Sequence, residues 1–400
     1  MKPPGEDRRL RMKKKLWLLT VLAVVVLLCT AGYFIFIKQA DIQIDEKHFP
    51  DSAFREAIME YDPDQDGKLS AKEIRDITFI DIHNRGIENL QGIEYLTELT
   101  AISGGYNNLT ELDVSQNTKL DRLDVIDNQL TKLDVSQNKE LVQLSCWNNR
   151  LTELDVSRNA KLEWLACGFN GLTELNVKEN AELKHLECYR NQITELDVSR
   201  NAKLEWLEAW GNQLTELDVS RNAELSSLYC NKNQIKEIDF SRNRKMIQVN
   251  VSGCEIKNLD LSLYPDLWGF ICEGCGLTEL DVSHNPKLYQ LYCEGNLLTE
   301  LDLSKNPKLE VLDCANNQLT ELDLSNNPLV DRLWCDGNKL TKLDISCCQD
   351  LVERLRKATA QEEDGSLQWD FPKDSYNTWY ERFVMRTDKD LELITEPVAQ

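Results

Sequence analysis

Residues 162–178 read LEWLACGFNGLTELNVK, a copy of the pattern L-x-x-L-x-C-x-x-N-x-L-x-x-L. The pattern recurs with a period of 21 residues, and a first unit, residues 77–98, is one residue longer. Its leading apolar residue stands at Leu99, Leu120, Leu141, Leu162, Leu183, Leu204, Leu225, Met246, Leu267, Leu288, Leu309 and Val330. Since one unit alone encloses no apolar interior, each unit must stack on its neighbours to fold.

A period of about 20 to 29 residues with leucine at these spacings is typical of a leucine-rich-repeat solenoid, in which each unit is a strand and a return segment. Strand side chains alternate between two faces, so Leu165 and Cys167, at positions four and six, should point inward. Positions three, five and seven should point outward and form one continuous concave face. We therefore predict an α/β-type repeat fold over residues 77–350, with about thirteen repeats and a parallel β-sheet on the concave face.

Position nine of the repeat is usually asparagine, at Asn107, Asn128, Asn149, Asn170, Asn191, Asn212, Asn233, Asn296, Asn317 and Asn338. An asparagine that turns inward can bond the backbone groups of the bend after the strand, which burial would otherwise leave unpaired. Cys254 and Cys275 replace it in two units. Because a thiol is a weaker donor than an amide, we expect a local change in the bend there.

Many of the thirteen cysteines occupy the inward sixth position, at Cys146, Cys167, Cys188, Cys230, Cys272, Cys293, Cys314 and Cys335. Other copies carry valine or alanine there, and a free cysteine behaves as a small apolar residue. We therefore predict a ladder of buried thiols. Disulfides between neighbouring coils are the alternative, above all for Cys254 with Cys275 and for the adjacent Cys347 and Cys348.

The formal net charge of the chain is −22, which argues against a nucleic acid as partner because polyanions attract basic surfaces. Residues 1–15 are the exception, with seven basic and two acidic side chains. Residues 16–37, LWLLTVLAVVVLLCTAGYFIFI, are uncharged and long enough to cross a bilayer as a helix. Cleavage near Ala31 or Ala40 is the alternative to a retained signal anchor.

Basic residues beside a span stay in the cytoplasm. We therefore predict a single-pass protein of the cell membrane, with a cytoplasmic segment 1–15, a transmembrane segment 16–37 and an extracellular C-terminal region. A short linker, residues 38–47, should follow the span.

Residues 48–76 should form an EF-hand-like cap before the repeats. Apolar residues at helical spacing predict a helix that begins at the N-cap candidate Asp51 and ends at about Tyr61. The next segment, DPDQDGKLSAKE, fits the twelve-residue calcium loop D-x-[DN]-x-[DN]-G-x5-E. One structural Ca²⁺ would be held by Asp62, Asp64, Asp66, Lys68, Ser70 and Glu73. A solvated, Asp-rich turn that caps the next helix is the alternative.

FPDSAF, DPDQDGKLS, ITFIDIHNRGIENLQGIEYLTEL and the copies of LTELDVSxN resemble the leucine-rich-repeat surface proteins of Gram-positive bacteria. Over residues 48–350 the chain is similar to internalins with 21-residue repeats and a cysteine ladder. The resemblance implies a surface protein that recognises another molecule through its concave face. The chain departs from that pattern by its amino-terminal span and by lacking a carboxy-terminal LPxTG-type sorting signal.

The return segments place an aspartate column on the convex side, at Asp113, Asp134, Asp155, Asp197, Asp218, Asp239, Asp260, Asp281, Asp302, Asp323 and Asp344. We expect each Asp, or the Ser two residues later, to bond a turn N–H; calcium along the column is the alternative. Residues 351–400 break the period and should form a C-terminal cap or small subdomain. Within them, LVERLRKATAQ should be an amphipathic helix over the last coil, and we expect residues 369–383 to add strands or a small subdomain.

Several outward positions carry aromatic residues, which predicts a ligand-binding surface at Trp147, Trp164, Tyr189, Trp206, Trp210 and Tyr229. Phe169 lies just beyond, and flanking Glu187, Glu208, His185, Arg190 and Lys232 could supply hydrogen bonds. The alternative is that the rings only stack on one another and stabilise the sheet. A second, acidic area is a weaker candidate, at Glu273, Tyr292, Glu294, Asp313, Trp334 and Asp336.

The sequence contains none of the motifs HExxH, GxSxG or a phosphate-binding loop, and its four histidines are scattered, so we predict no enzyme. We predict a membrane-anchored extracellular protein that recognises a protein or carbohydrate partner. The alternative is a structural or scaffolding protein of the cell envelope.

Overall fold

The computed structural model describes residues 41–256, 259–357, 359–363, 366–370 and 383–396. Within these ranges, no helix has the length and apolar character that a bilayer span requires. The basic segment 1–15 and the expected span 16–37 lie outside the described residues.

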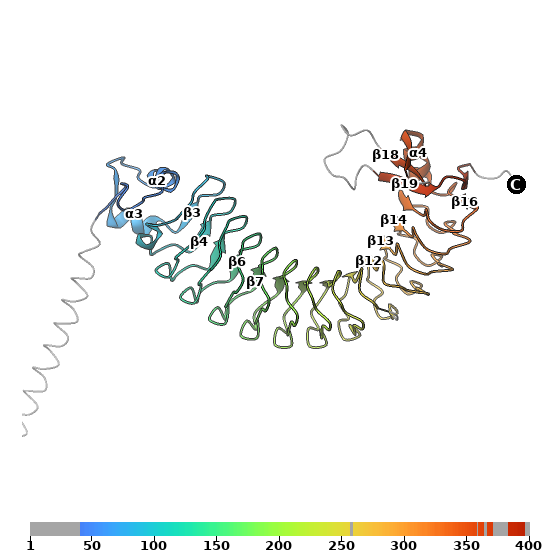
Figure 1. Cartoon of the computed structure of the whole chain (residues 1–400), viewed down its shortest axis with the longest axis horizontal. Coiled ribbons are helices and arrows are strands. Elements are labelled where there is room, and N and C mark those ends of the chain that lie inside the picture. The colour runs from blue at the N-terminus through green and yellow to red at the C-terminus, as the bar shows by residue number, and fades with distance from the viewer. Residues whose placement is uncertain (1–40, 257–258, 358, 364–365, 371–382, 397–400) are drawn as a thin grey trace, which may run out of the picture.

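The repeats form a curved solenoid whose short strands line the inner side of an arc (Figure 1). Each strand is parallel to its neighbours and pairs with them in chain order, so the predicted parallel sheet is confirmed. The strands are β3 (Phe79–Asp81), β4 (Ala101–Ser103), β5 (Arg122–Asp124), β6 (Gln143–Ser145), β7 (Trp164–Ala166), β8 (His185–Glu187), β9 (Trp206–Glu208), β10 (Ser227–Tyr229), β11 (Gln248–Asn250), β12 (Gly269–Ile271), β13 (Gln290–Tyr292), β14 (Val311–Asp313) and β15 (Arg332–Trp334).

The strand register advances by one whole repeat from coil to coil. Leu165 pairs with Leu144 on one side and Leu186 on the other, and all three are fully buried. Each such leucine contributes about 1.5–3 kcal/mol through burial. The predicted inward direction of positions four and six is therefore confirmed, which leaves positions three, five and seven on the concave face.

The N-terminal cap contains α2 (Ser52–Met59), β2 (Lys68–Leu69) and α3 (Ala71–Asp76), with η1 (Ile93–Tyr95) at the start of the repeats. Asp51 is the N-cap of α2, as predicted, and accepts hydrogen bonds from two backbone N–H groups. Residues 41–47 are more than the expected linker. They include β1 (Ile42–Gln43), which pairs antiparallel with β2, and the buried Ile44.

The C-terminal segment closes the other end of the solenoid. It contains β16 (Lys342–Asp344), α4 (Gln349–Lys357), β17 (Thr359–Glu363), β18 (Ser366–Asp370), β19 (Phe383–Asp388) and β20 (Glu392–Ile394). The expected helix ends at Lys357 instead of continuing to Gln361, because the chain enters β17. β19 pairs parallel with β15 and buries Val384 and Met385, so a non-repeat strand covers the last coil.

The position-nine asparagines have the predicted inward role. Asn149, for example, donates from Nδ2 to the carbonyls of Val125 (2.9 Å) and Cys146 (3.0 Å), and its Oδ1 accepts from the N–H of Leu130. The Cys254 and Cys275 thiols donate to carbonyls of the preceding coils at 3.4 and 3.3 Å. At Cys254 the bend gains a turn hydrogen bond from the Cys254 N–H to the Val251 carbonyl, at 3.1 Å.

A second asparagine column, not among the predicted features, lies in the return segments. Its members are fully buried: Asn117, Asn138, Asn159, Asn180, Asn201, Asn222, Asn243, Asn285, Asn306 and Asn327. Asn201 Nδ2 donates to the carbonyls of Val177 (2.9 Å) and Asn180 (2.8 Å), thereby joining neighbouring coils. In the coil that lacks this asparagine, the Tyr264 hydroxyl donates to the Phe240 carbonyl at 2.6 Å.

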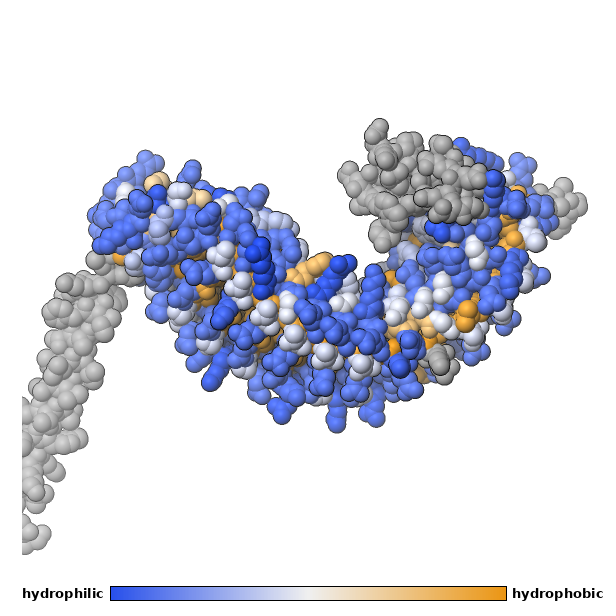
Figure 2. Space-filling model, viewed as in Figure 1, coloured by the Kyte–Doolittle hydropathy of each residue, from blue (hydrophilic) through white to orange (hydrophobic). Residues whose placement is uncertain are grey.

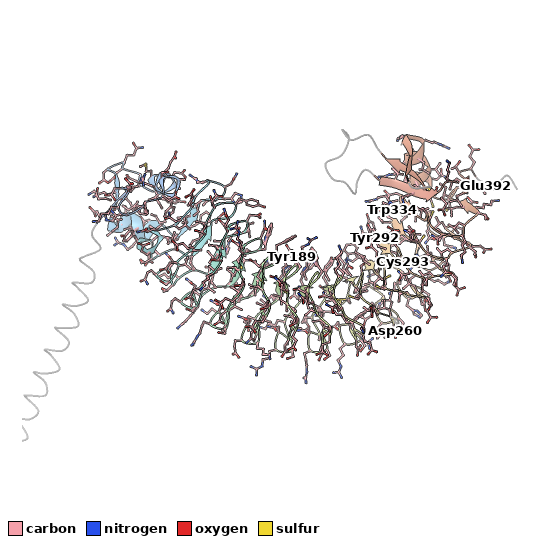
Figure 3. The ribbon with its side chains drawn as sticks, viewed as in Figure 1. Tyr189, Asp260, Tyr292, Cys293, Trp334 and Glu392 are labelled. Carbon is pink, nitrogen blue, oxygen red and sulfur yellow. The ribbon has the colours of Figure 1, made fainter. Side chains whose placement is uncertain are left out.

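The aspartate column bonds its turns as expected. In each of these turns the Asp Oδ1 accepts from the backbone N–H of the Ser two residues later, as Asp218 does from Ser220 at 2.8 Å. These hydrogen bonds from Ser220 lower the pKa of Asp218. Asp260 shows the position of the column on the outer side of the arc (Figure 3).

The cysteine ladder is also confirmed. All twelve cysteines of the described ranges are free, and only Cys347 is not fully buried. Burial raises the pKa of the Cys146 and Cys188 thiols to about 12. Neutral, apolar thiols therefore line the interior behind the sheet.

Candidate binding surface on the concave face

Four side chains on neighbouring strands form the first half of the aromatic surface, which we call the strand stack: Trp164, His185, Trp206 and Tyr229. The imidazole of His185 lies between two indoles, 3.5 Å from Trp164 and 5.3 Å from Trp206 between ring centroids, with nearly parallel planes. The Tyr229 ring is tilted against Trp206 at 5.4 Å. The strand register explains the stack, because Trp164, His185 and Trp206 pair directly across β7, β8 and β9.

A second group, the loop stack, lies where the same coils leave the sheet: Phe169, Tyr189, Arg190 and Trp210. The Tyr189 and Trp210 rings are stacked 4.9 Å apart with planes 1° from parallel. Phe169 meets both rings edge-on, and the Arg190 guanidinium lies 4.9 Å from the Phe169 ring centroid. Tyr189 lies close above Gly168, where an added Cβ would be 2.8 Å from the ring.

Glu208 connects the two stacks. Its Oε1 accepts from Trp206 Nε1 at 2.9 Å and its Oε2 from Trp210 Nε1 at 3.4 Å. Burial raises the pKa of Glu208, while these hydrogen bonds oppose the shift. Burial also raises the pKa of Tyr189 and Tyr229 to about 12, so both phenols are neutral donors at physiological pH.

The structure brings five of the six predicted ligand-binding residues into these stacks. Trp147 is half-buried at the same repeat position as Tyr189 and Trp210, but no aromatic contact among the described residues joins it to them. The intervening coil carries Gly168 at this position, which interrupts the row. His185 belongs in the centre of the strand stack, and its shared repeat position with Trp164 and Trp206 could have revealed that.

The rings are less exposed than the sequence suggested, because they cover one another. Phe169 is the most accessible of them, 39% exposed, and has a left-handed backbone with φ of 49°. The same left-handed conformation recurs at this repeat position, as in Tyr106, Asn148 and Arg190, so it belongs to the bend that follows each strand. The molecular surface is mainly hydrophilic, with apolar areas along the inner side of the arc (Figure 2).

The acidic area forms a separate pocket of about 510 Å³ further along the concave face. Five of its six expected residues come close to one another there: Glu273, Tyr292, Glu294 and Trp334 surround Asp313. Asp336 instead accepts a 2.6 Å hydrogen bond from Arg386, which belongs to β19. Sequence reasoning missed Arg386, since it lies outside the repeats. Tyr292 and Trp334 are both on the inner side of the arc (Figure 3).

The expected calcium loop brings three of its six residues together. One carboxylate oxygen each of Asp62, Asp64 and Asp66 lies within 4.8 Å of the others. Asp62 is 6% exposed; its Oδ2 accepts from Gly67 N–H at 2.9 Å, whereas its Oδ1 is buried without a hydrogen-bond partner. Such an oxygen suits an oxygen-seeking cation such as Ca²⁺.

The other three expected ligands have different partners. Glu73 and Ser70 form the capping box of α3, in which Glu73 Oε2 accepts from Ser70 N–H at 2.7 Å. The Lys68 ammonium pairs with Asp41 at 2.7 Å, whereas the expected calcium ligand of this residue is its backbone carbonyl. Gly67 has a φ of 80°, as the sharp turn of such a loop requires.

The 21-residue repeat, the inward asparagines and the buried thiols together define a leucine-rich-repeat protein with a cysteine ladder. The Leucine Rich Repeat family matches residues 318–338. The chain is an internalin-like leucine-rich-repeat protein: 83 of its residues, 20% of its length, are 37% identical to Internalin J of Listeria monocytogenes. This match spans 9% of Internalin J.

Solved structures of other proteins share the fold of this chain. The functional domain of InlJ from Listeria monocytogenes, which includes a cysteine ladder, superposes with a TM-score of 0.60 at 28% identity, over 89% of this chain and 100% of that one. An internalin, InlF, of Listeria monocytogenes has the same fold, with a TM-score of 0.59 at 20% identity, over 78% of this chain and 96% of that one. So does a leucine-rich-repeat protein of Leptospira interrogans, with a TM-score of 0.58 at 22% identity over 68% and 82%.

Proposed function

We propose that this protein recognises another protein at the bacterial cell surface through the strand stack and the loop stack. The observation that carries the proposal is the loop stack, where the exposed Phe169 ring lies against Arg190 and Trp210. Aromatic and arginine side chains held rigidly on a sheet resemble the hot spots of protein interfaces. The likeness to the functional domain of InlJ supports a binding role.

A protein partner fits this surface better than a carbohydrate. Sugar rings bind by stacking on open aromatic faces, but the faces of His185 and Trp206 already cover their neighbours. Ring edges, the Phe169 side chain and the Arg190 guanidinium suit contacts with protein side chains.

Anchoring in the cell membrane is part of this proposal. The uncharged residues 16–37, with the basic residues 1–15 before them, support a single span with the repeats outside the cell. We further propose one Ca²⁺ in the loop of Asp62, Asp64 and Asp66, where it would stabilise the cap over the first coil. The unpaired Asp62 oxygen supports this site.

The proposal is tested by capture of partners from host-cell-surface and bacterial-envelope extracts on the full chain in lipid nanodiscs. Phe169→Ala and Trp210→Ala should each lower the affinity for an identified partner at least tenfold. Tyr106→Ala is the matched control, since Tyr106 shares the repeat position, the exposure and the left-handed backbone of Phe169. If both variants bind the partner as tightly as the wild type does, recognition lies elsewhere on the protein. If no partner binds saturably, the scaffold alternative is favoured.

A further inference from the structure

The pocket around Asp313 has an arrangement that the aromatic surface lacks. Asp313 on β14 pairs directly with Tyr292 on β13 and with Trp334 on β15, so a carboxylate lies between two rings on neighbouring strands. Two inter-strand spacings, about 9.6 Å, separate the backbones that carry the two rings, and the strand of Asp313 lies between them.

The floor of the pocket holds three carboxylates. Glu273, Glu294 and Asp313 each offer an oxygen, and these oxygens lie within 4.8 Å of one another. Asp313 is only 9% exposed, yet it lines the pocket. Its Oδ1 accepts from Ala315 N–H at 3.1 Å, and its Oδ2 accepts no hydrogen bond from the described residues.

Positive charge near the pocket is already used by other carboxylates. Arg386 pairs with Asp336 at 2.6 Å and Arg332 with Asp331 at 3.3 Å. Among the described residues, no salt bridge reaches Glu273, Glu294 or Asp313. Burial, followed by the neighbouring Glu294, raises the pKa of Asp313 to about 8. Lys232 attracts Glu273, and Arg386 attracts Glu294 and Asp313, only at longer range. Three adjacent carboxylates without an ion-pair partner are unfavourable unless a cation or a proton joins them.

We propose that this pocket binds a primary ammonium group, namely a lysine side chain of a protein partner. The ammonium donates hydrogen bonds to the carboxylates of Glu273, Glu294 and Asp313. Tyr292 and Trp334 flank its aliphatic stem and add cation–π attraction. A bare metal ion would use neither the volume of about 510 Å³ nor the aromatic walls.

This site is distinct from the two aromatic stacks, whose last strand is β10, and it goes beyond the function proposed above. The non-repeat strand β19 contributes to it through Arg386, which neutralises Asp336 and thereby leaves the three pocket carboxylates as the acceptors. The C-terminal segment is therefore part of the binding surface as well as a cover for the last coil.

The test uses the full chain in nanodiscs and a fluorescein-labelled tetralysine peptide, with binding followed by anisotropy in 150 mM salt (about physiological ionic strength). Asp313→Asn, Glu294→Gln and Trp334→Ala should each weaken binding at least about fivefold. The Nε-acetylated peptide should bind the wild type at least about tenfold more weakly, because it lacks the ammonium charge.

Matched controls separate the pocket from the general negative charge of the chain. Asp302→Asn and Glu300→Gln make the same chemical changes on the convex side and should alter binding less than about twofold. Asp313→Asn should keep or raise the melting temperature, since the amide oxygen can still accept from Ala315 and one repulsive charge is lost. The proposal would be overturned if the control variants weakened peptide binding as much as the pocket variants do. It would also be overturned if the acetylated peptide bound as tightly as the unmodified one, or if Ca²⁺ bound without the peptide in a way that depends on Asp313.

Discussion

The imidazole of His185 lies 3.5 Å from the indole of Trp164, with the two ring planes 4° from parallel. Its Nε2 is also 2.7 Å from Glu187 Oε1, so the ring is held by a partner on its own strand. Stacked rings and this hydrogen bond fix His185 at the centre of the strand stack.

We therefore predict that His185→Ala destabilises the fold by about 1–2 kcal/mol and changes the near-ultraviolet circular dichroism of the indoles. Gln143→Ala is the control, because Gln143 is exposed at the same repeat position one coil before Trp164. Chemical denaturation of both variants gives the comparison. Equal stability of the two would mean that the stack contributes nothing to folding.

Calcium should raise the melting temperature of the full chain, because a ligand that binds only the folded state stabilises it. Asp62→Asn and Glu73→Gln should abolish this rise. Glu56→Gln, an exposed carboxylate of α2 outside the loop, should leave the response intact. A calcium response that survives in Glu73→Gln would remove this loop from consideration as the site.

The buried thiols should be unreactive in the native protein. Burial raises the pKa of Cys146 and Cys188 to about 12, so almost no thiolate is present at pH 8. A thiol reagent should modify the half-buried Cys347 first, and the ladder only after denaturation. Fewer than about eight free thiols under denaturing, non-reducing conditions would contradict the ladder.

Periodic sequence features predicted the fold well, because each repeated residue has one geometric role. Leu165 and Asn149 lie as their positions require. The same logic could have found His185 and the Asn201 column, since both follow the 21-residue period. It could not find Arg386, because β19 reaches the sheet through a segment with no repeat. Nor does periodicity show that outward rings cover one another, since stacking depends on side-chain rotamers.

The second asparagine column should matter more than its single polar group suggests. Asn201→Ala removes the donors to the Val177 and Asn180 carbonyls, which are buried between coils. We expect a loss of about 2 kcal/mol or more in the free energy of unfolding. Asn201→Tyr should be tolerated no better, because the Tyr264 coil also has Phe240 against its ring. Urea unfolding measures both; a loss below about 0.5 kcal/mol for Asn201→Ala would contradict the role.

The aspartate column should make the solenoid sensitive to acid. Hydrogen bonds from Ser220 lower the pKa of Asp218 in the folded state, and the corresponding serine does the same for Asp134. The unfolded chain therefore binds more protons than the folded one as these groups titrate. Their contribution to stability is present above the unfolded pKa of about 3.9 and is lost as the pH falls through the lower folded value.

Urea midpoints between pH 6 and pH 3 should therefore fall with pH in the wild type, and should fall less in Asp218→Asn. The asparagine oxygen can still accept from Ser220 but does not titrate. Glu216→Gln is the control, since Glu216 is an exposed carboxylate two residues before Asp218 in the same return segment. The column has eleven such aspartates, so a single substitution should change the pH dependence of the urea midpoint only slightly. Adding Asp197→Asn and then Asp239→Asn to Asp218→Asn should enlarge the effect step by step. An unchanged slope in the triple variant would show that these turns do not couple folding to protonation.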